Sequence, residues 1–287
     1  MGNFFSLFFE IILCTAAPFL VLGLAVWFLR QVFVQLVGTN SGRPFLIGTF
    51  ALSTPLREAG HVAMAVLFWH RVEAVRFLDM NALDGEMGYV EHSYHPRNPV
   101  ALLGNFFFAL GPVLLGLVAV LIIFLVCFGG VMEQFFTELS ALSGTGTIAD
   151  YLRVGVGLIS KMVASDAVSV FPKILGGLLL LLVCMGVFVS LGELLEGLFG
   201  AALYAGLSLL AALTLSLLDA RVQRVATDGL RAFATGVLAL YLPVLLAVLV
   251  LLAVGAVFFL IRKLGAVPET GNALEVYRGD DEQTQEE

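Results

Sequence analysis

The amino-acid sequence predicts an all-α polytopic membrane protein with about six transmembrane helices and a small β-hairpin at the membrane edge. Hydrophobic residues make up 60% of the 287 residues and charged residues only 13%, which gives a mean hydropathy of +0.99. A soluble domain is about half apolar and a quarter charged, so the excess apolar side chains must face lipid. Several apolar stretches also reach the roughly 20 residues that a spanning helix needs.

The apolar stretches are separated by polar patches and prolines. Residues 192–197 form a polar patch between the fourth and fifth stretches, and Pro243 is expected to kink the last one because proline removes a helix hydrogen bond. In chain order, the predicted spans are residues 8–37, 45–69, 100–128, 174–190, 191–218 and 232–261. Helices suit these spans because every backbone group inside a membrane must be paired.

Charge and composition divide the chain further. The polar residues 220–231 are expected to join the last two spans, and the net charge of −7 owes much to acidic residues near the C-terminus. An acidic chain without a basic arm argues against nucleic-acid binding and leaves membrane lipid as the general partner. The predicted parts are an N-terminal transmembrane helix (1–43), a membrane core (44–218), a C-terminal transmembrane helix (219–263) and an acidic, disordered tail (264–287).

Two connections between the spans carry structural signals. Residues 72–94 begin with alternating apolar and polar residues, contain the turn pair Asp84-Gly85 and end in a second short apolar run, so they predict a β-hairpin. Residues 132–142 and 148–163 have helical periodicity and predict two surface helices. These helices are expected either to lie at the membrane interface or to form a lid over a lateral gate.

The second predicted span contains a zinc-protease motif with one ligand replaced. In H-E-x-x-H on a helix, two histidines on one face hold zinc and the glutamate is the general base. The run Arg57-Glu58-Ala59-Gly60-His61 keeps the glutamate and the second histidine but has arginine at the first position. Arginine stays charged and has no lone pair for a metal.

Further ionisable residues lie near the fourth and fifth spans. Glu193 and Glu196 are three residues apart and share one helix face, as Arg57 and His61 do on theirs. Ionisable residues inside spans are expensive and mark functional sites. If the two spans meet, these charges converge and must pair or become neutral. If Arg57 neutralises the buried carboxylates, one of its guanidinium nitrogens should lie within about 4 Å of a carboxylate oxygen of Glu58, Glu193 or Glu196.

The chain resembles the site-2 protease family of intramembrane zinc metalloproteases, as a degenerate member, over roughly residues 45–200. Three pieces carry the resemblance. The first is Arg57-Glu58-Ala59-Gly60-His61 with the apolar run that follows it to His70. The second is Gly88-Tyr89-Val90-Glu91-His92-Ser93-Tyr94, followed by Asn98-Pro99 and Gly104-Asn105-Phe106-Phe107. The third is Ser190-Leu191-Gly192-Glu193-Leu194-Leu195-Glu196-Gly197, at the place of the family's acidic zinc ligand.

The resemblance implies a site-2-protease-like core at 44–218 and a role for each matching residue. Glu58 would be the general base, His61 a zinc ligand, and Glu193 or Glu196 the third ligand. His92 or His95 could supply a substitute ligand, and Asn105 would contact either substrate or a neighbouring helix. Without these roles, His61 is a hydrogen-bonded core histidine, Glu193 and Glu196 mark a wetted helix break, and His70 is an interfacial residue at a span end.

Arg57 separates the functional hypotheses. The first is a pseudoprotease, in which Arg57 replaces the metal as a cation and the scaffold binds or assembles with another membrane protein. The second is an active zinc metalloprotease with altered ligation, and the third is a transporter or channel subunit that uses the buried charges. Zinc is expected only in the second, and the resemblance implies a bacterial inner membrane as the location.

Overall fold

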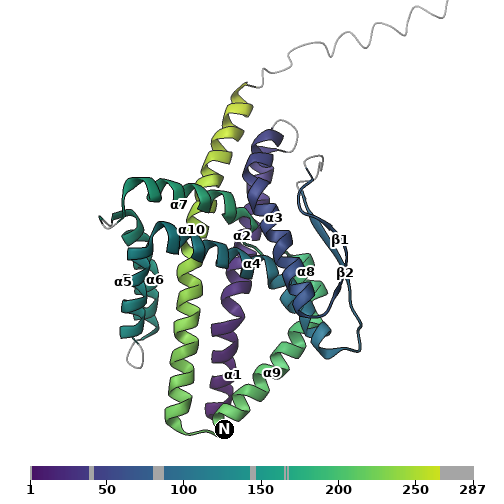
Figure 1. The fold of residues 1–287 in the computed structure, drawn as a ribbon, viewed down its shortest axis with the longest axis vertical. Helices are drawn as coiled ribbons and strands as arrows, with labels where there is room; N and C mark the ends of the chain where they lie inside the picture. The colour runs from purple at the N-terminus through teal and green to yellow at the C-terminus, as the bar shows by residue number, and fades with distance from the viewer. Residues whose placement is uncertain are drawn as a thin grey trace, which may run out of the picture.

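The computed structural model describes residues 2–38, 42–79, 87–142, 147–164, 166 and 168–265. Within them the chain is mostly helical and carries one two-stranded sheet (Figure 1). In chain order the elements are α1 (Gly2–Thr15), α2 (Ala17–Val37), α3 (Arg43–Leu67), β1 (Arg71–Arg76), β2 (Tyr89–Ser93), α4 (Pro99–Cys127), α5 (Gly129–Ala141), α6 (Ile148–Ala164), α7 (Val170–Val183), the short 3-10 helix η1 (Cys184–Gly186), α8 (Leu191–Glu196), α9 (Leu198–Ser216) and α10 (Ala220–Gly265).

Four helical stretches in the described part of the chain are long and apolar enough to cross a membrane. They are Phe4–Val37, Pro99–Cys127, Leu198–Ser216 and Ala220–Leu264. This is the composition of a membrane protein, as the sequence predicts, although the number of such stretches is smaller than the six expected. Two predicted spans account for the difference, because α3 carries Arg57, Glu58 and His61 in its middle and α7 has only 14 residues.

The last helix begins earlier than the sequence predicts. Residues 220–231, expected to be a polar connection, form the first turns of α10, which runs for 46 residues with Pro243 inside it. A run of charged and apolar residues without proline at this point allows the helix to start at Ala220. Figure 1 shows the start of α10 beside the lower end of α9 and the N-terminus. The acidic tail expected at 264–287 lies outside the described residues after Gly265.

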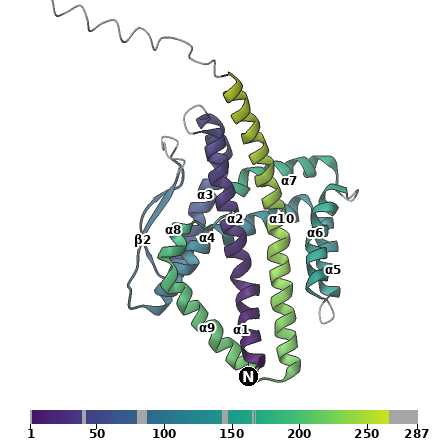
Figure 2. The same ribbon diagram turned by 180° about the vertical axis from the view of Figure 1, so that it is seen from behind.

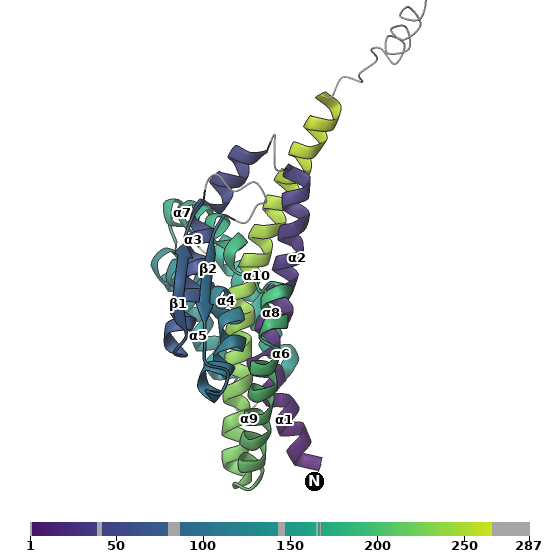
Figure 3. The ribbon, with the colours of Figure 1, turned by 90° about the vertical axis from the view of Figure 1, so that its right-hand side faces the viewer.

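The predicted hairpin is present as an antiparallel pair of strands. Arg71 pairs with Ser93 and Arg76 with Tyr89, with an irregularity between Val72 and Ala74. The expected turn at Asp84-Gly85 falls outside the described residues. The strands lie along α3 at one edge of the molecule, which Figure 3 shows from the side. The hairpin can therefore cover the side chains of α3 on that side.

Two further helices form at the positions predicted for residues 132–142 and 148–163. Helices α5 and α6 contact each other, and Lys161 on α6 donates to Glu138 on α5. They lie on the opposite side of the molecule from the hairpin (Figure 2). This separation places them away from the residues of the zinc-protease motif on α3.

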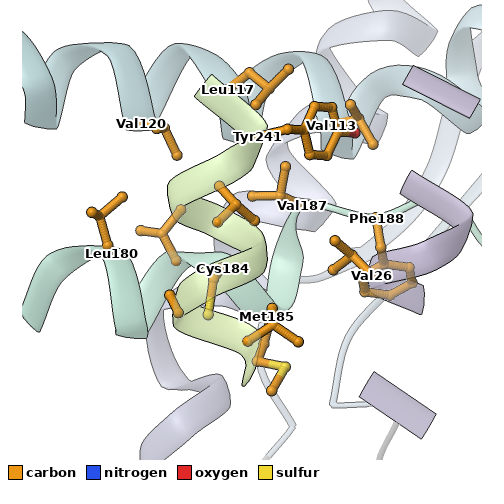
Figure 4. Close-up of a cluster of buried hydrophobic side chains, with 14 of the residues drawn as sticks. Val26, Val113, Leu117, Val120, Leu180, Cys184, Met185, Val187, Phe188 and Tyr241 are labelled. Carbon is orange, nitrogen blue, oxygen red and sulfur yellow. The ribbon is translucent and has the colours of Figure 1, made fainter. Parts of the chain in front are cut away.

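The apolar core lies where α2, α4, α7, η1 and α10 meet. Tyr241 of α10 is fully buried, and its hydroxyl donates to the carbonyl oxygen of Phe19 at 3.5 Å. Figure 4 shows side chains from these elements pointing toward one another. The labelled residues are Val26, Val113, Leu117, Val120, Leu180, Cys184, Met185, Val187, Phe188 and Tyr241. This packing fixes the segment that connects η1 to α8, and with it the position of α8.

Candidate functional site

Helix α3 brings the altered zinc-protease motif into the interior of the protein. Glu58 and His61 are buried, with exposed fractions of 1% and 2%, whereas the Arg57 side chain keeps 19% of its surface exposed. Pro55 lies inside the helix just before them and removes one backbone donor. The motif is therefore presented on a helical face that is almost closed to solvent.

A close crossing of α3 and α4 fixes the direction of His61. A Cβ atom added at Gly60 would lie 2.5 Å from the carbonyl oxygen of Gly111, so only glycine permits this approach. The crossing places His61 Nδ1 3.0 Å from the carbonyl oxygen of Phe108. Because a carbonyl can only accept, Nδ1 carries the hydrogen and donates, and Nε2 faces the other way. Metal-binding histidines are commonly oriented by such a bond.

The start of α8 fixes the direction of Glu193. Ser190 is the N-cap residue and forms a capping box, in which its hydroxyl accepts from the Glu193 backbone N–H at 3.2 Å. In return Glu193 Oε2 accepts from the Ser190 backbone N–H at 3.3 Å. The other carboxylate oxygen, Oε1, is left to face α3.

Arg57, Glu58, His61 and Glu193 form one polar group, which we call the Arg57 cluster. Arg57 Nη1 donates to Glu58 Oε1 at 2.5 Å, and Arg57 Nη2 donates to Glu193 Oε1. His61 Nε2 lies 3.2 Å from that same Glu193 oxygen. The contact expected between Arg57 and a carboxylate of this group is therefore present twice, from two different helices.

The Arg57 cluster is held against an aromatic ring and leaves two atoms unpaired. The Arg57 guanidinium lies 4.9 Å from the centroid of the Phe188 ring, within the range of a cation–π interaction. Glu58 Oε2 and Arg57 Nε are buried and have no hydrogen-bond partner among the described residues. Unsatisfied buried polar atoms are uncommon in native proteins and call for an explanation.

The Arg57 cluster opens into a cavity of about 480 Å³. Its walls come from α2, α3, β2 with the residues just before it, α4, and the segment from η1 to α8. Gly88 allows the chain to pass close to the cluster, since a Cβ atom there would lie 2.8 Å from Glu58 Cγ. The charged residues of the wall are Arg30, Arg57, Glu58, Glu91, Glu193 and Glu196, and the aromatic ones are Trp27, Phe50, Tyr89, Phe108 and Phe188.

The structure brings some of the remaining predicted residues to this cavity. Glu196 is exposed on α8 and lines the cavity, although it makes no ion pair with the described residues. His92 on β2 lines the cavity and bonds to the Asn105 side chain. Asn105 is buried on α4. His95 is exposed, accepts from the Arg97 backbone N–H at 3.3 Å and is not part of the cavity wall.

Two further residues near the site, His70 and Arg30, were not predicted to lie there. His70, expected at the membrane interface, is buried because it stacks on His92 at 5.0 Å and its Nε2 donates to the Ala101 carbonyl oxygen at 2.7 Å. Arg30 on α2 lines the cavity and lies 5.1 Å from the Phe188 ring centroid. The sequence does contain a signal for Arg30, because it is an ionisable residue inside an apolar span.

The donor set of the Arg57 cluster does not fit a zinc ion. Zinc sites use three protein ligands and one open position in catalytic centres. In the cluster the guanidinium of Arg57 already bonds to one oxygen each of Glu58 and Glu193 and stands beside His61. The described residues contain no group of three or more His, Cys, Asp or Glu arranged to hold a metal. A metal would thus have to displace a fixed cation.

Comparison of the chain with protein-family models, with curated proteins and with solved structures finds no match.

Proposed function

We propose that this protein is a membrane scaffold of the site-2 protease type in which Arg57 takes the place of the catalytic zinc, located in a bacterial inner membrane. It binds or assembles with another membrane protein and does not hydrolyse peptide bonds. The observation that carries this proposal is the double contact of Arg57 with Glu58 and Glu193, next to His61.

The chemistry of the guanidinium supports the loss of hydrolysis. Zinc lowers the pKa of a bound water and polarises a carbonyl, and both actions require an empty coordination site. Arg57 offers no lone pair and no such site, and it bonds to Glu58 Oε1, one of the two oxygens that a general base would use. Arg57 thus supplies the positive charge that the carboxylates of Glu58 and Glu193 need, but it cannot act as a Lewis acid as zinc does.

The electrostatics of burial support the role of Arg57 as a replacement cation. Glu58 is 1% exposed, and a buried carboxylate without a cation is strongly unfavourable. Arginine suits this position better than lysine, because its planar fork can serve two carboxylates at once. The scaffold can therefore keep its fold without a metal.

A single substitution tests this proposal. Arg57→His completes H-E-x-x-H on α3, so the purified variant should gain about one zinc per chain while the parent protein gains little. Arg30→His is the matched control, because it adds a histidine to the wall of the same cavity outside the motif and should not gain zinc.

Two results would contradict the proposal. Equal zinc contents in Arg57→His and Arg30→His would mean that position 57 is not equivalent to the missing ligand. Stoichiometric zinc in the parent protein would instead favour an active metalloprotease, for which His92 is the remaining imidazole in the cavity wall outside α3.

A further inference from the structure

We propose that the cavity beside the Arg57 cluster binds a single organic cation, an ammonium or guanidinium group carried on an apolar stem. This inference rests on the proposed function, because it concerns the same cavity and names the chemistry of the partner. It is carried by three features of the described residues: an excess of carboxylates, a buried carboxylate oxygen without a donor, and aromatic walls.

The excess of acid remains after the internal ion pairs are counted. Four glutamates and two arginines line the cavity. Arg57 serves Glu58 and Glu193, and Arg30 stacks on the rings of Phe50 and Phe188. Glu91 on β2 and Glu196 on α8 are exposed and make no ion pair with the described residues. Unpaired negative charge is therefore left on two elements of the cavity wall, β2 and α8.

Glu58 provides an independent indication of a ligand that donates hydrogen bonds. It lines the cavity and is 1% exposed, its Oε1 is bonded to Arg57, and its Oε2 has no partner among the described residues. A buried carboxylate oxygen without a donor costs free energy that a bound N–H group would recover. Ammonium and guanidinium groups supply such donors together with the charge that the cavity lacks.

The aromatic walls favour an organic cation over a hydrated metal ion. Trp27, Tyr89 and Phe108 lie in the cavity wall. Aromatic faces attract ammonium and guanidinium groups, and Phe188 already has two guanidinium groups within 5.1 Å of its ring centroid. A volume of about 480 Å³ also lies in the range of small-ligand pockets. The same chemistry is found in a basic side chain of another membrane segment and in a free alkylamine.

Calorimetric titration of the full chain in detergent micelles tests the inference. The probes are n-butylammonium and n-butylguanidinium, with n-butanol and butyrate as neutral and anionic counterparts of similar size. The two cations should bind, and butanol and butyrate should not. A hydrophobic helical peptide with one terminal lysine, compared with the same peptide carrying glutamine, then separates a protein partner from a small molecule. Binding of the lysine peptide, without binding of the glutamine peptide, assigns the cavity to a partner segment.

Variants of the two exposed glutamates connect binding to this cavity. Glu91→Gln and Glu196→Gln should each weaken cation binding roughly threefold, and the double variant roughly tenfold. Glu133→Gln on α5 is the matched control, because Glu133 is exposed and remote from the cavity wall. It should bind like the parent protein. Melting temperatures close to that of the parent would show that the variants remain folded.

Two outcomes would overturn the inference: butanol or butyrate binding as tightly as the ammonium probe, or the double variant binding like the parent. Both are distinct from a failure of the proposed function. Stoichiometric zinc in the parent protein would remove the proposed function without deciding cation binding. If the protein is free of zinc and binds neither cation, the inference fails and the proposed function stands.

Discussion

Arg57 on α3 and Glu193 on α8 form an ion pair although they are 136 residues apart in the chain. The oxygen of Glu193 that accepts from Arg57 also lies 3.2 Å from His61 Nε2. The pair therefore joins α3, which carries the altered zinc-protease motif, to α8, which carries Glu193. Its geometry depends on the capping box of Ser190 and on the close crossing of α3 and α4, and both can be tested by substitution.

Replacing Arg57 by alanine should destabilise the protein. The change leaves Glu58 and Glu193 close together without their cation, and breaking a buried pair from one side costs roughly 3 kcal/mol when one partner keeps some solvent contact. Denaturant unfolding in detergent measures this loss. The control is Arg153→Ala on α6, whose side chain is 80% exposed and pairs with Asp150. This change should cost less than about 0.5 kcal/mol, and equal losses for both variants would contradict the structural role of Arg57.

Gly60→Ala should destabilise the protein through the crossing of α3 and α4. The new Cβ atom would meet the backbone carbonyl of Gly111 at 2.5 Å, and backbone cannot give way as a side chain does. Overpacking of this kind costs about 1–3 kcal/mol. Gly48→Ala on the same helix is the matched control, because no atom lies within 4 Å of its added Cβ. That variant should be as stable as the parent or gain up to about 1 kcal/mol, and a destabilised Gly48→Ala would show that the effect is not specific to the crossing.

Ser190→Ala should loosen α8 and the orientation of Glu193. The variant removes the hydroxyl that accepts from the Glu193 backbone N–H, and loss of an N-cap side chain costs about 1 kcal/mol. Ser190→Thr keeps a hydroxyl at the same place and should restore most of the stability. Thermal unfolding of the three proteins checks the order. Alanine and threonine variants of equal stability would mean that the capping box does not hold this helix.

His92 should make stability depend on pH. Burial of its ring lowers the pKa of His92 below its ordinary value of 6.5, and the neighbouring His70 lowers it further. The Asn105 hydrogen bond raises the pKa again in part, and His61 acts in the lowering direction. A histidine whose pKa is lower in the folded state contributes stability above pH 6.5, and that contribution is lost as the pH falls toward the folded pKa.

Thermal unfolding at several pH values measures this contribution. Between about pH 7.5 and about pH 5.5 the parent protein should lose more stability than His92→Gln, which no longer titrates at this position. His95→Gln is the control, because His95 is exposed and lies outside the cavity wall, and its curve should follow that of the parent. Parallel curves for the parent and His92→Gln would remove His92 as the source of the pH dependence.

The fold class was predictable from composition and periodicity. The apolar spans, the hairpin around residues 72–94 and the helices at 132–142 and 148–163 each rest on a local pattern of a few turns. The number of apolar helices was less predictable, because a span such as 174–190 has suitable composition but forms a 14-residue helix followed by η1. Where a helix ends depends on packing against other elements, which a local pattern does not contain.

The candidate site was predictable in part. The spacing of Arg57, Glu58 and His61 identifies them, and the expected contact with Glu193 is present. The choice between Glu193 and Glu196 could not be made, because it depends on which face of α8 the capping box turns toward α3. The burial of His70 likewise results from tertiary packing, which a local pattern does not contain. Arg30 could be singled out as an arginine inside an apolar span, but only packing places it on the cavity wall.

The zinc content of the purified parent protein tests the central claim most directly. If Arg57 replaces the metal, elemental analysis should find less than about a tenth of an equivalent of zinc per chain, even after exposure to zinc and desalting. His61→Ala should then change nothing, because no metal is there to lose. One equivalent of zinc that His61→Ala removes would contradict the account, since His61 would be a working ligand and Arg57 would not occupy the place of the metal.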